Sequence, residues 1–199
     1  MRIIAGQWRG RRIEAPRGDT ARPTIDRVRE SLMSVLASAR GTLEGAVVLD
    51  AFAGSGALGL EALSRGAAYV WFFERDRAVY RTLSSNIAQF GLTDACAHAR
   101  CADTLAAIPH PPRPFDLVLL DPPYRIEATA VYDLLDRLHD AGALSPNVIV
   151  SYEHAAARDA SPEAAGDAQA WRTLSRKKYG NVSIDIIVRA DGAHANEGM

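Results

Sequence analysis

The sequence has no long apolar run and almost no net charge. None of its 199 residues belongs to a run approaching the roughly 18 consecutive apolar residues of a membrane span. The first residues, Met1 to Gly6, contain no apolar stretch long enough for a signal peptide. A net charge of -1 argues against a protein that binds nucleic acid indiscriminately. We therefore expect a cytoplasmic protein without a membrane segment.

Cysteine is scarce too, with only Cys96 and Cys101 in the chain. Two cysteines without a second pair at zinc-binding spacing do not predict a metal site. Free thiols in a reducing compartment are the simpler interpretation. We expect no bound metal.

The amino-acid composition fits one globular domain. Hydrophobic residues make up 48% and charged residues 24%, which is the balance of an ordinary soluble fold. The charge is uneven: residues 1–30 hold eight arginines against four acidic residues, and residues 171–189 hold five basic residues against one acidic. Two basic ends suit a surface for a polyanion. They suit solvated charged faces equally well, so charge alone does not decide between the two.

The apolar pattern divides the chain into three parts. Residues 1–40 predict a short β-hairpin followed by a helix with an apolar stripe from Ile25 to Leu36. Residues 41–190 alternate between short apolar strands and helices. Residues 191–199 form a tail that we expect to be frayed.

The alternation in the second part predicts a parallel sheet with helices on both faces. Residues 171–178 and 182–188 differ, because they flank Tyr179-Gly180-Asn181 and predict an antiparallel hairpin. Residues 155–170 predict a loop or a poor helix. The expected fold class is α/β: a mostly parallel seven-stranded sheet closed by an antiparallel C-terminal hairpin, with an N-terminal β-hairpin and helix extension. This resembles the Rossmann-like S-adenosylmethionine-dependent methyltransferase fold.

A glycine-rich motif ends the first strand of the alternating region. Asp50-Ala51-Phe52-Ala53-Gly54-Ser55-Gly56 leads directly into a helix. Glycines there let a ligand approach the backbone, and the helix N-terminus favours an anionic group such as a carboxylate. The pattern D-x-F-x-G-x-G resembles the first motif of S-adenosylmethionine-dependent methyltransferases more closely than the nicotinamide fingerprint.

Two later acidic residues complete the predicted cofactor site. Glu74 ends the next strand, where a carboxylate should accept hydrogen bonds from both ribose hydroxyls. Asp103 follows the third strand and is placed to meet the adenine amino group, with a solvated carboxylate as the equal alternative. The residues expected to bind S-adenosylmethionine are Asp50, Phe52, Ala53, Gly54, Ser55, Gly56, Glu74, Arg75 and Asp103.

A second motif follows the strongest predicted strand. In Asp121-Pro122-Pro123-Tyr124 the two prolines fix an extended turn and remove two backbone donors, so carbonyl oxygens stay free to accept. The Asp121 carboxylate and the Pro122 carbonyl can hold both hydrogens of an amino group on a base, which localises its lone pair. Tyr124 supplies a face for stacking. The motif resembles the D/N/S-P-P-Y/F/W of amino-methyltransferases, so we expect Asp121, Pro122, Pro123 and Tyr124 to be catalytic.

Two N-terminal stretches narrow the resemblance to one family. R-I-I-A-G in residues 2–6 and R-P-T-x-D-R-V-R-E in residues 22–30 are similar to the RsmD-type 16S ribosomal RNA (guanine 2-amino) methyltransferases of bacteria. The likeness extends through both motifs to Lys178-Tyr179-Gly180 and covers the chain to about Val188, apart from residues 155–166. It implies a monomeric enzyme that methylates the 2-amino group of one guanine in 16S ribosomal RNA, on a 30S subunit or an assembly intermediate.

The resemblance also implies where RNA binds. A guanine amine is inaccessible in paired RNA, so the enzyme must take a loop base or flip one out. Residues 1–40 would dock RNA and cover the cofactor, and residues 41–190 would form the catalytic domain. The basic residues expected to hold phosphates are Arg2, Arg9, Arg11, Arg12, Arg22, Arg176, Lys177 and Lys178.

Other functions share parts of this pattern. A DNA adenine amino-methyltransferase shares D-P-P-Y, but such enzymes usually add a target-recognition region, for which 199 residues leave little room. A glutamine-amide methyltransferase usually has asparagine in place of Asp121. A non-catalytic RNA-binding ribosome assembly factor is expected to have degraded motifs, and a nicotinamide dehydrogenase has no use for D-P-P-Y. The methylated nucleotide and the proton acceptor stay open at this point.

Overall fold

Seven strands form one sheet in the computed structural model, which describes residues 1–15, 23–166 and 169–192. Their order is β3-β2-β1-β4-β5-β7-β6, with β7 antiparallel to both of its neighbours and the other pairs parallel. The strands are β1 Val47–Asp50, β2 Tyr69–Glu74, β3 Ala97–Cys101, β4 Phe115–Leu120, β5 Leu144–Ala155, β6 Trp171–Tyr179 and β7 Val182–Arg189. The predicted fold class is confirmed, with its closing antiparallel hairpin.

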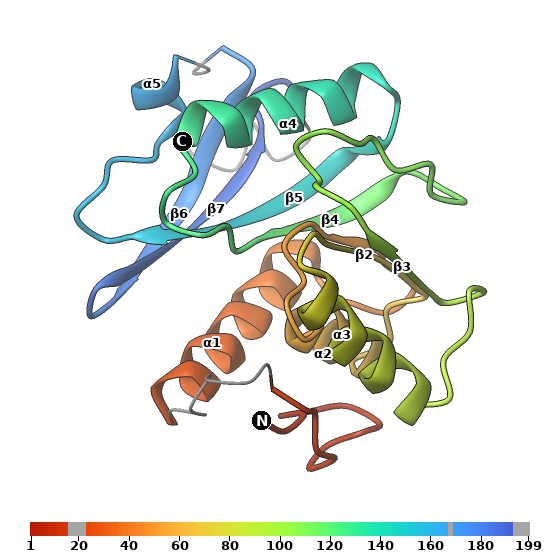
Figure 1. Cartoon of the computed structure of the whole chain (residues 1–199). Helices are drawn as coiled ribbons and strands as arrows, with labels where there is room; N and C mark the ends of the chain where they lie inside the picture. Colours follow the sequence, from red (N-terminus) through yellow and green to blue (C-terminus); the bar gives the residue numbers. More distant parts are fainter. Residues whose placement is uncertain (16–22, 167–168, 193–199) are drawn as a thin grey trace.

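Helices cover both faces of the sheet, which is why the central strands are mostly apolar (Figure 1). Every residue of β1 is buried, and so is the run from Leu117 to Leu120 in β4. One face carries α1 Pro23–Arg40, α2 Ala57–Ser64 and α3 Arg77–Gln89, and the other carries α4 Ala128–Asp140 and α5 Pro162–Ala165. Each face therefore has its own apolar core.

Local sequence sets the limits of α3. The Asp76 carboxylate caps the helix by accepting from the backbone N–H of Val79 at 3.0 Å and of Ala78 at 2.7 Å. These two hydrogen bonds hold the pKa of Asp76 below its usual value. After the helix, Gly91 has a φ of 69°, a left-handed conformation that glycine adopts without strain.

The predicted N-terminal hairpin forms only in part. Arg2 and Arg12 make a single antiparallel bridge in place of two paired strands. The reason is that the backbone N–H groups of Ile4 and Ala5 donate instead to the Glu61 carboxylate in α2, at 2.8 and 3.0 Å. The segment therefore lies against α2 and α3, on their side away from the sheet (Figure 1).

The C-terminal half has more regular structure than the pattern predicts. β5 begins at Leu144 and ends at Ala155, because its backbone pairs with β7 as far as the hairpin turn. Residues 155–170 include α5, capped by Ser161. The predicted tail is described only at its first two residues, so its frayed state lies outside the described residues. None of the helices in the described ranges is long and apolar enough to span a membrane.

Glu61 provides a test of how the N-terminal segment is held. Glu61→Ala would leave the amides of Ile4 and Ala5 and the buried Arg29 without this carboxylate, so the free energy of unfolding should fall by about 3 kcal/mol. Urea unfolding measures the change. Glu30→Ala, at an exposed position of α1, is the control and should change stability by less than about 0.5 kcal/mol. Equal stability of both variants would contradict this account.

Candidate active site

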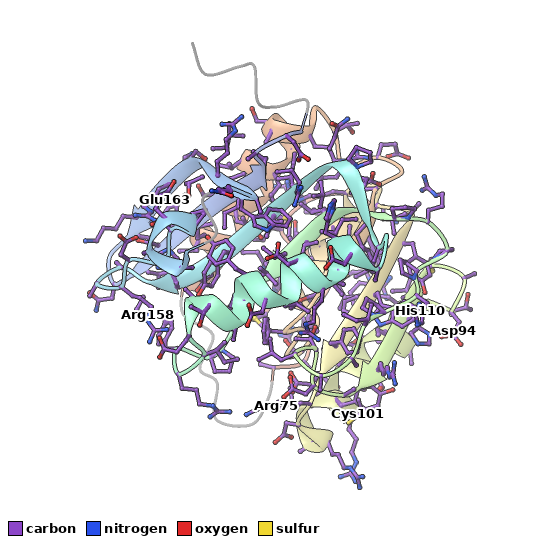
Figure 2. All side chains as sticks on the ribbon, turned by 90° about the horizontal axis from the view of Figure 1, so that it is seen from above. Arg75, Asp94, Cys101, His110, Arg158 and Glu163 are labelled. Carbon is purple, nitrogen blue, oxygen red and sulfur yellow. The ribbon has the colours of Figure 1, made fainter. Side chains whose placement is uncertain are left out.

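The site lies at the edge of the sheet where β1, β2 and β4 end. These strands are adjacent and parallel, so the segments that follow them meet at one edge, where ligands bind in open α/β sheets. Figure 2 shows Arg75, Cys101 and Arg158 toward this edge, and Asp94 and His110 elsewhere, where the chain enters β3 and β4.

Asp50 fixes the loop that leaves β1. Its carboxylate is 1% exposed and accepts a hydrogen bond from the Gly59 N–H in α2 at 2.9 Å. Burial, against the opposing effect of that hydrogen bond and with smaller contributions from the nearby Asp121 and Glu74, raises the pKa of Asp50 to about 7. Asp50 does not line either cavity described below, so the structure gives it a positioning role. Its direct contact with a cofactor stays a prediction.

The two glycines of the loop are required by its backbone. Gly54 has a φ of 54° and Gly56 a φ of 85°, both in the left-handed region. A Cβ on Gly56 would lie 2.6 Å from Cδ1 of Leu83. The Gly54 N–H donates to Oε2 of Glu74 at 3.0 Å, which ties the loop to the end of β2.

A first cavity of about 440 Å³ opens beyond the ends of β1 to β4. This volume lies within the roughly 300–1,000 Å³ of small-molecule sites. Its lining is Ala51, Phe52, Gly54, Phe73, Glu74, Arg75, Val79, Ala102, Asp103, Thr104, Asp121, Pro122, Pro123, Tyr124 and Ile126. Most of the predicted cofactor residues are therefore brought together here.

Fixed acceptors and one orphaned hydroxyl line the first cavity. Glu74 accepts from Gly54 through one oxygen and from the Asp76 N–H at 2.7 Å through the other, which leaves each oxygen a further acceptor position. Thr104 is 2% exposed, and its hydroxyl has no hydrogen-bond partner among the described residues. At the mouth, Arg75 lies 3.7 Å from Asp103, both half exposed. Buried polar groups normally have partners, so Thr104 indicates a site built for a ligand.

A second cavity of about 310 Å³ lies on the other side of the loop. It is lined by Met1, Val28, Arg29, Leu32, Phe52, Ala53, Gly54, Ser55, Ala57, Leu58, Asp121, Glu153, Tyr179 and Val182. Phe52, Gly54 and Asp121 belong to both linings. Asp121 therefore stands where a group bound in one cavity meets a group bound in the other.

The residues after Asp121 have the predicted acceptor geometry. The Pro123 carbonyl accepts from the Ile126 N–H at 2.9 Å, whereas no described residue donates to the Pro122 carbonyl. Tyr124 is 56% exposed, unusually so for a large side chain, and lies at the rim of the first cavity. The predicted catalytic residues thus lie together at the junction.

Arg176 makes an ion pair that the sequence did not predict, and its role as a phosphate ligand stays a prediction. Its guanidinium donates twice to the Asp185 carboxylate, at 2.6 and 2.7 Å, and lies 3.8 Å from Asp159. The pair raises the pKa of Arg176, chiefly through these hydrogen bonds. Lys177 and Lys178 are exposed beside the β6–β7 turn, whose residues border the second cavity.

Arg9 and Arg11, two of the predicted RNA-binding arginines, lie away from both cavities. Arg11 donates to the Gln89 carbonyl at 2.8 Å and lies over the Phe90 ring at 4.1 Å, at the C-terminal end of α3. Because α2 and α3 begin at the site, Arg9 and Arg11 are at the remote ends of these helices. They can contact RNA only outside the cavities. Arg2 and Arg12, which form the bridge, are exposed, and Arg22 lies outside the described residues.

Sequence analysis missed much of the second cavity. Met1, Arg29, Glu153 and Tyr179 line it, and Thr104 lines the first. Arg29 and Tyr179 belong to the stretches that carry the family resemblance, which was the available signal. Met1 and Glu153 reach the site through tertiary packing. Within the described ranges, no three His, Cys, Asp or Glu side chains gather to hold a metal ion.

The raised pKa of Asp50 gives a stability prediction. The folded protein keeps this carboxyl protonated up to about pH 7, but the unfolded chain releases the proton near 3.8, so the parent loses stability as pH rises between these values. Asp50→Asn keeps an acceptor for Gly59 and does not titrate. Its stability relative to the parent should therefore rise by up to about 4 kcal/mol between pH 4 and pH 8.

Urea unfolding at several pH values measures this difference. Asp76→Asn is the matched control. Because the pKa of Asp76 is lowered in the folded protein, the parent gains stability as pH rises, and the free energy of unfolding of this variant should fall relative to the parent. A pH-independent difference for Asp50→Asn would refute the assignment.

Comparison with known proteins agrees with this geometry. The family model described as "Conserved hypothetical protein 95" matches residues 1–188. Ribosomal RNA small subunit methyltransferase D of Escherichia coli strain K12 is 40% identical over 153 residues, covering 77% of this chain and 74% of that protein. The protein of the same name from Haemophilus influenzae is 36% identical over 155 residues, covering 77% and 78%. The solved structure of Escherichia coli yhhF has a TM-score of 0.77 and 34% identity, covering 95% and 97%.

The family match contains both motifs, the N-terminal stretches and the C-terminal hairpin. The expectation of an RsmD-type family is confirmed. The chain belongs to the family of ribosomal RNA small subunit methyltransferase D.

Proposed function

We propose that this enzyme transfers a methyl group from S-adenosylmethionine to the 2-amino group of one guanine in 16S ribosomal RNA. The observation that carries the proposal is the pair of cavities with Asp121 in their common wall. A methyl donor in the first cavity and a base in the second would meet at this carboxylate. The names of the relatives support ribosomal RNA as the substrate.

The residues of the first cavity fit S-adenosylmethionine. The two fixed oxygens of Glu74 suit the ribose hydroxyls. Asp103 and the orphaned hydroxyl of Thr104 suit the polar edge of adenine, and the start of α2 beyond Gly56 suits the carboxylate. When bound, S-adenosylmethionine supplies an electrophilic methyl group on sulfur.

Asp121 and Pro122 prepare the amine. Each amine hydrogen donates to one acceptor, the Asp121 carboxylate or the Pro122 carbonyl, so the nitrogen lone pair turns toward the methyl group. The donor, held by Glu74 and Asp103, would supply its methyl group to this nitrogen and leave as S-adenosylhomocysteine. The nitrogen then releases one proton, for which Asp121 is the adjacent base. Tyr124 stacks on the exposed base.

The substrate is a structured RNA. Exposed Lys177 and Lys178 beside the second cavity suit phosphates next to a flipped base, and the arginines at the remote ends of α2 and α3 suit a second part of a large RNA. We propose that the monomer acts in the cytoplasm on the 30S subunit or its precursor.

Labelled methyl transfer tests this function. The acceptors come from cells lacking the gene: 30S particles, deproteinised 16S RNA, genomic DNA and total soluble protein. The proposal expects label in the 30S particle that digests to 2-methylamino guanosine. Label confined to DNA or protein would overturn the substrate, and cofactor binding without any transfer would favour an assembly factor.

Asp121→Ala tests the chemical role. Loss of an oriented acceptor at the junction should lower turnover by about a hundredfold or more, while binding of S-adenosylhomocysteine stays nearly intact. Single-turnover transfer and calorimetric binding measure the two effects. Asp94→Ala, at an exposed aspartate far from the site, is the control (Figure 2). Unchanged turnover of the Asp121 variant would contradict the mechanism.

Lys177→Ala combined with Lys178→Ala tests the RNA contact. If each lysine neutralises one phosphate, the slope of log affinity against log salt should become shallower by about 1.5 to 2. Filter binding to 16S RNA at several salt concentrations measures the slope. Arg113→Ala, exposed before β4 at the opposite edge, should leave it unchanged. An unchanged slope in the lysine double variant would remove these residues from the interface.

A further inference from the structure

We propose that Glu153 recognises guanine by accepting the hydrogen bond of its ring N1–H, beside the 2-amino group held by Asp121 and Pro122. This makes Glu153 a specificity-determining residue. The inference rests on the proposed function, because it takes guanine as the base in the second cavity.

The strand register places Glu153 next to Asp121. Leu120 of β4 lies opposite Tyr152 of β5, and each of the two carboxyl residues comes one position later. Neighbouring strands are about 4.8 Å apart, so Asp121, just after β4, and Glu153, within β5, lie side by side. Both line the second cavity.

Glu153 has the features of a ligand-binding group. Its side chain forms no hydrogen bond or ion pair with any residue in the described ranges. Burial and, to a lesser degree, the charge of Asp121 together raise its pKa to about 8. A carboxyl held in this setting without a partner costs stability, which an apolar side chain would avoid. A polar group that enters the cavity would provide the missing partner.

The chemistry of the base matches two adjacent acceptors. In guanine, the N1 atom is bonded to the ring carbon that carries the 2-amino group. The N1–H and the 2-amino group are therefore neighbours, and both donate hydrogen bonds. With the 2-amino group at Asp121, the N1–H points to the neighbouring carboxyl of Glu153. Above the raised pKa of Glu153, where its carboxyl is ionised and can only accept, a purine without that hydrogen presents a lone pair there and loses the contact.

Arg29 and Tyr179 also line the second cavity, but both already have hydrogen-bond partners. Arg29 is 3% exposed, and its guanidinium donates to the Arg2 carbonyl at 2.6 Å. The Tyr179 hydroxyl is hydrogen-bonded to Ser31. Glu153 is therefore the lining carboxyl best placed to accept from the base beside Asp121.

Replacement of the target guanine by a base that lacks N1–H tests the proposal. Once the methylated guanine has been mapped, 30S particles are rebuilt with 2-aminopurine at that position, which keeps the 2-amino group and lacks N1–H. In an assay buffered above the raised pKa of Glu153, at about pH 8.5, the wild-type enzyme should prefer guanine by about a hundredfold in kcat/KM, as expected for loss of a hydrogen bond to a charged group. Glu153→Ala should lower the guanine value by a similar factor and leave the 2-aminopurine value within about threefold, so the preference disappears.

Glu153→Gln gives a result that a structural role would not produce. Its amide can accept from N1–H or donate to a bare N1, so 2-aminopurine should become a better substrate than it is for the wild type. Glu163→Ala, on exposed α5, is the control and should keep the wild-type preference (Figure 2).

The outcomes separate this inference from the proposed function. Equal losses on both bases in Glu153→Ala, with no gain in Glu153→Gln, would overturn the role of Glu153 while 2-amino methylation still stands. Failure of the wild-type enzyme to methylate any guanine 2-amino group would overturn the proposed function itself.

Discussion

The hydrogen bond between the Asp50 carboxylate and the Gly59 N–H is the interaction on which the site depends. It ties the end of β1 to the first turn of α2 and so fixes the loop between them. That loop provides Phe52 and Gly54, which separate the two cavities. The fold keeps a buried carboxyl of raised pKa at this point, and the loop that it fixes lies between the two cavities that Asp121 lines.

A second carboxylate joins the N-terminal segment to α2. Glu61 receives two backbone N–H groups from the segment and lies in α2, the same helix that Asp50 anchors. Through this attachment Met1 and Arg29 reach the second cavity. The segment that carries the family signature therefore helps to form the wall where the base is proposed to bind. Arg9 and Arg11 of this segment lie away from both cavities, where we propose that they contact a second part of the RNA.

The sheet and the first cavity could be predicted from sequence, because both follow from local patterns. Apolar runs mark β1, β2 and β4, and the glycine and D-P-P-Y motifs lie directly after two of them. The contacts that local patterns do not predict depend on long-range pairing. Arg176 meets Asp185 only because β6 pairs with β7 in one register, and Glu153 joins the site only because β5 lies beside β4. No local signal fixes these registers. The predicted N-terminal hairpin forms only in part, because the backbone N–H groups of Ile4 and Ala5 donate to Glu61.

The central claim is that methyl transfer occurs across the wall shared by the two cavities. The most direct measurement is a crystal structure with a non-reactive S-adenosylmethionine analogue that has an amine in place of the sulfonium methyl group. The account predicts adenosine in the first cavity, ribose hydroxyls on Glu74, and the amine beside Asp121, facing the second cavity. Adenosine in the second cavity, or an amine turned away from Asp121, would contradict it.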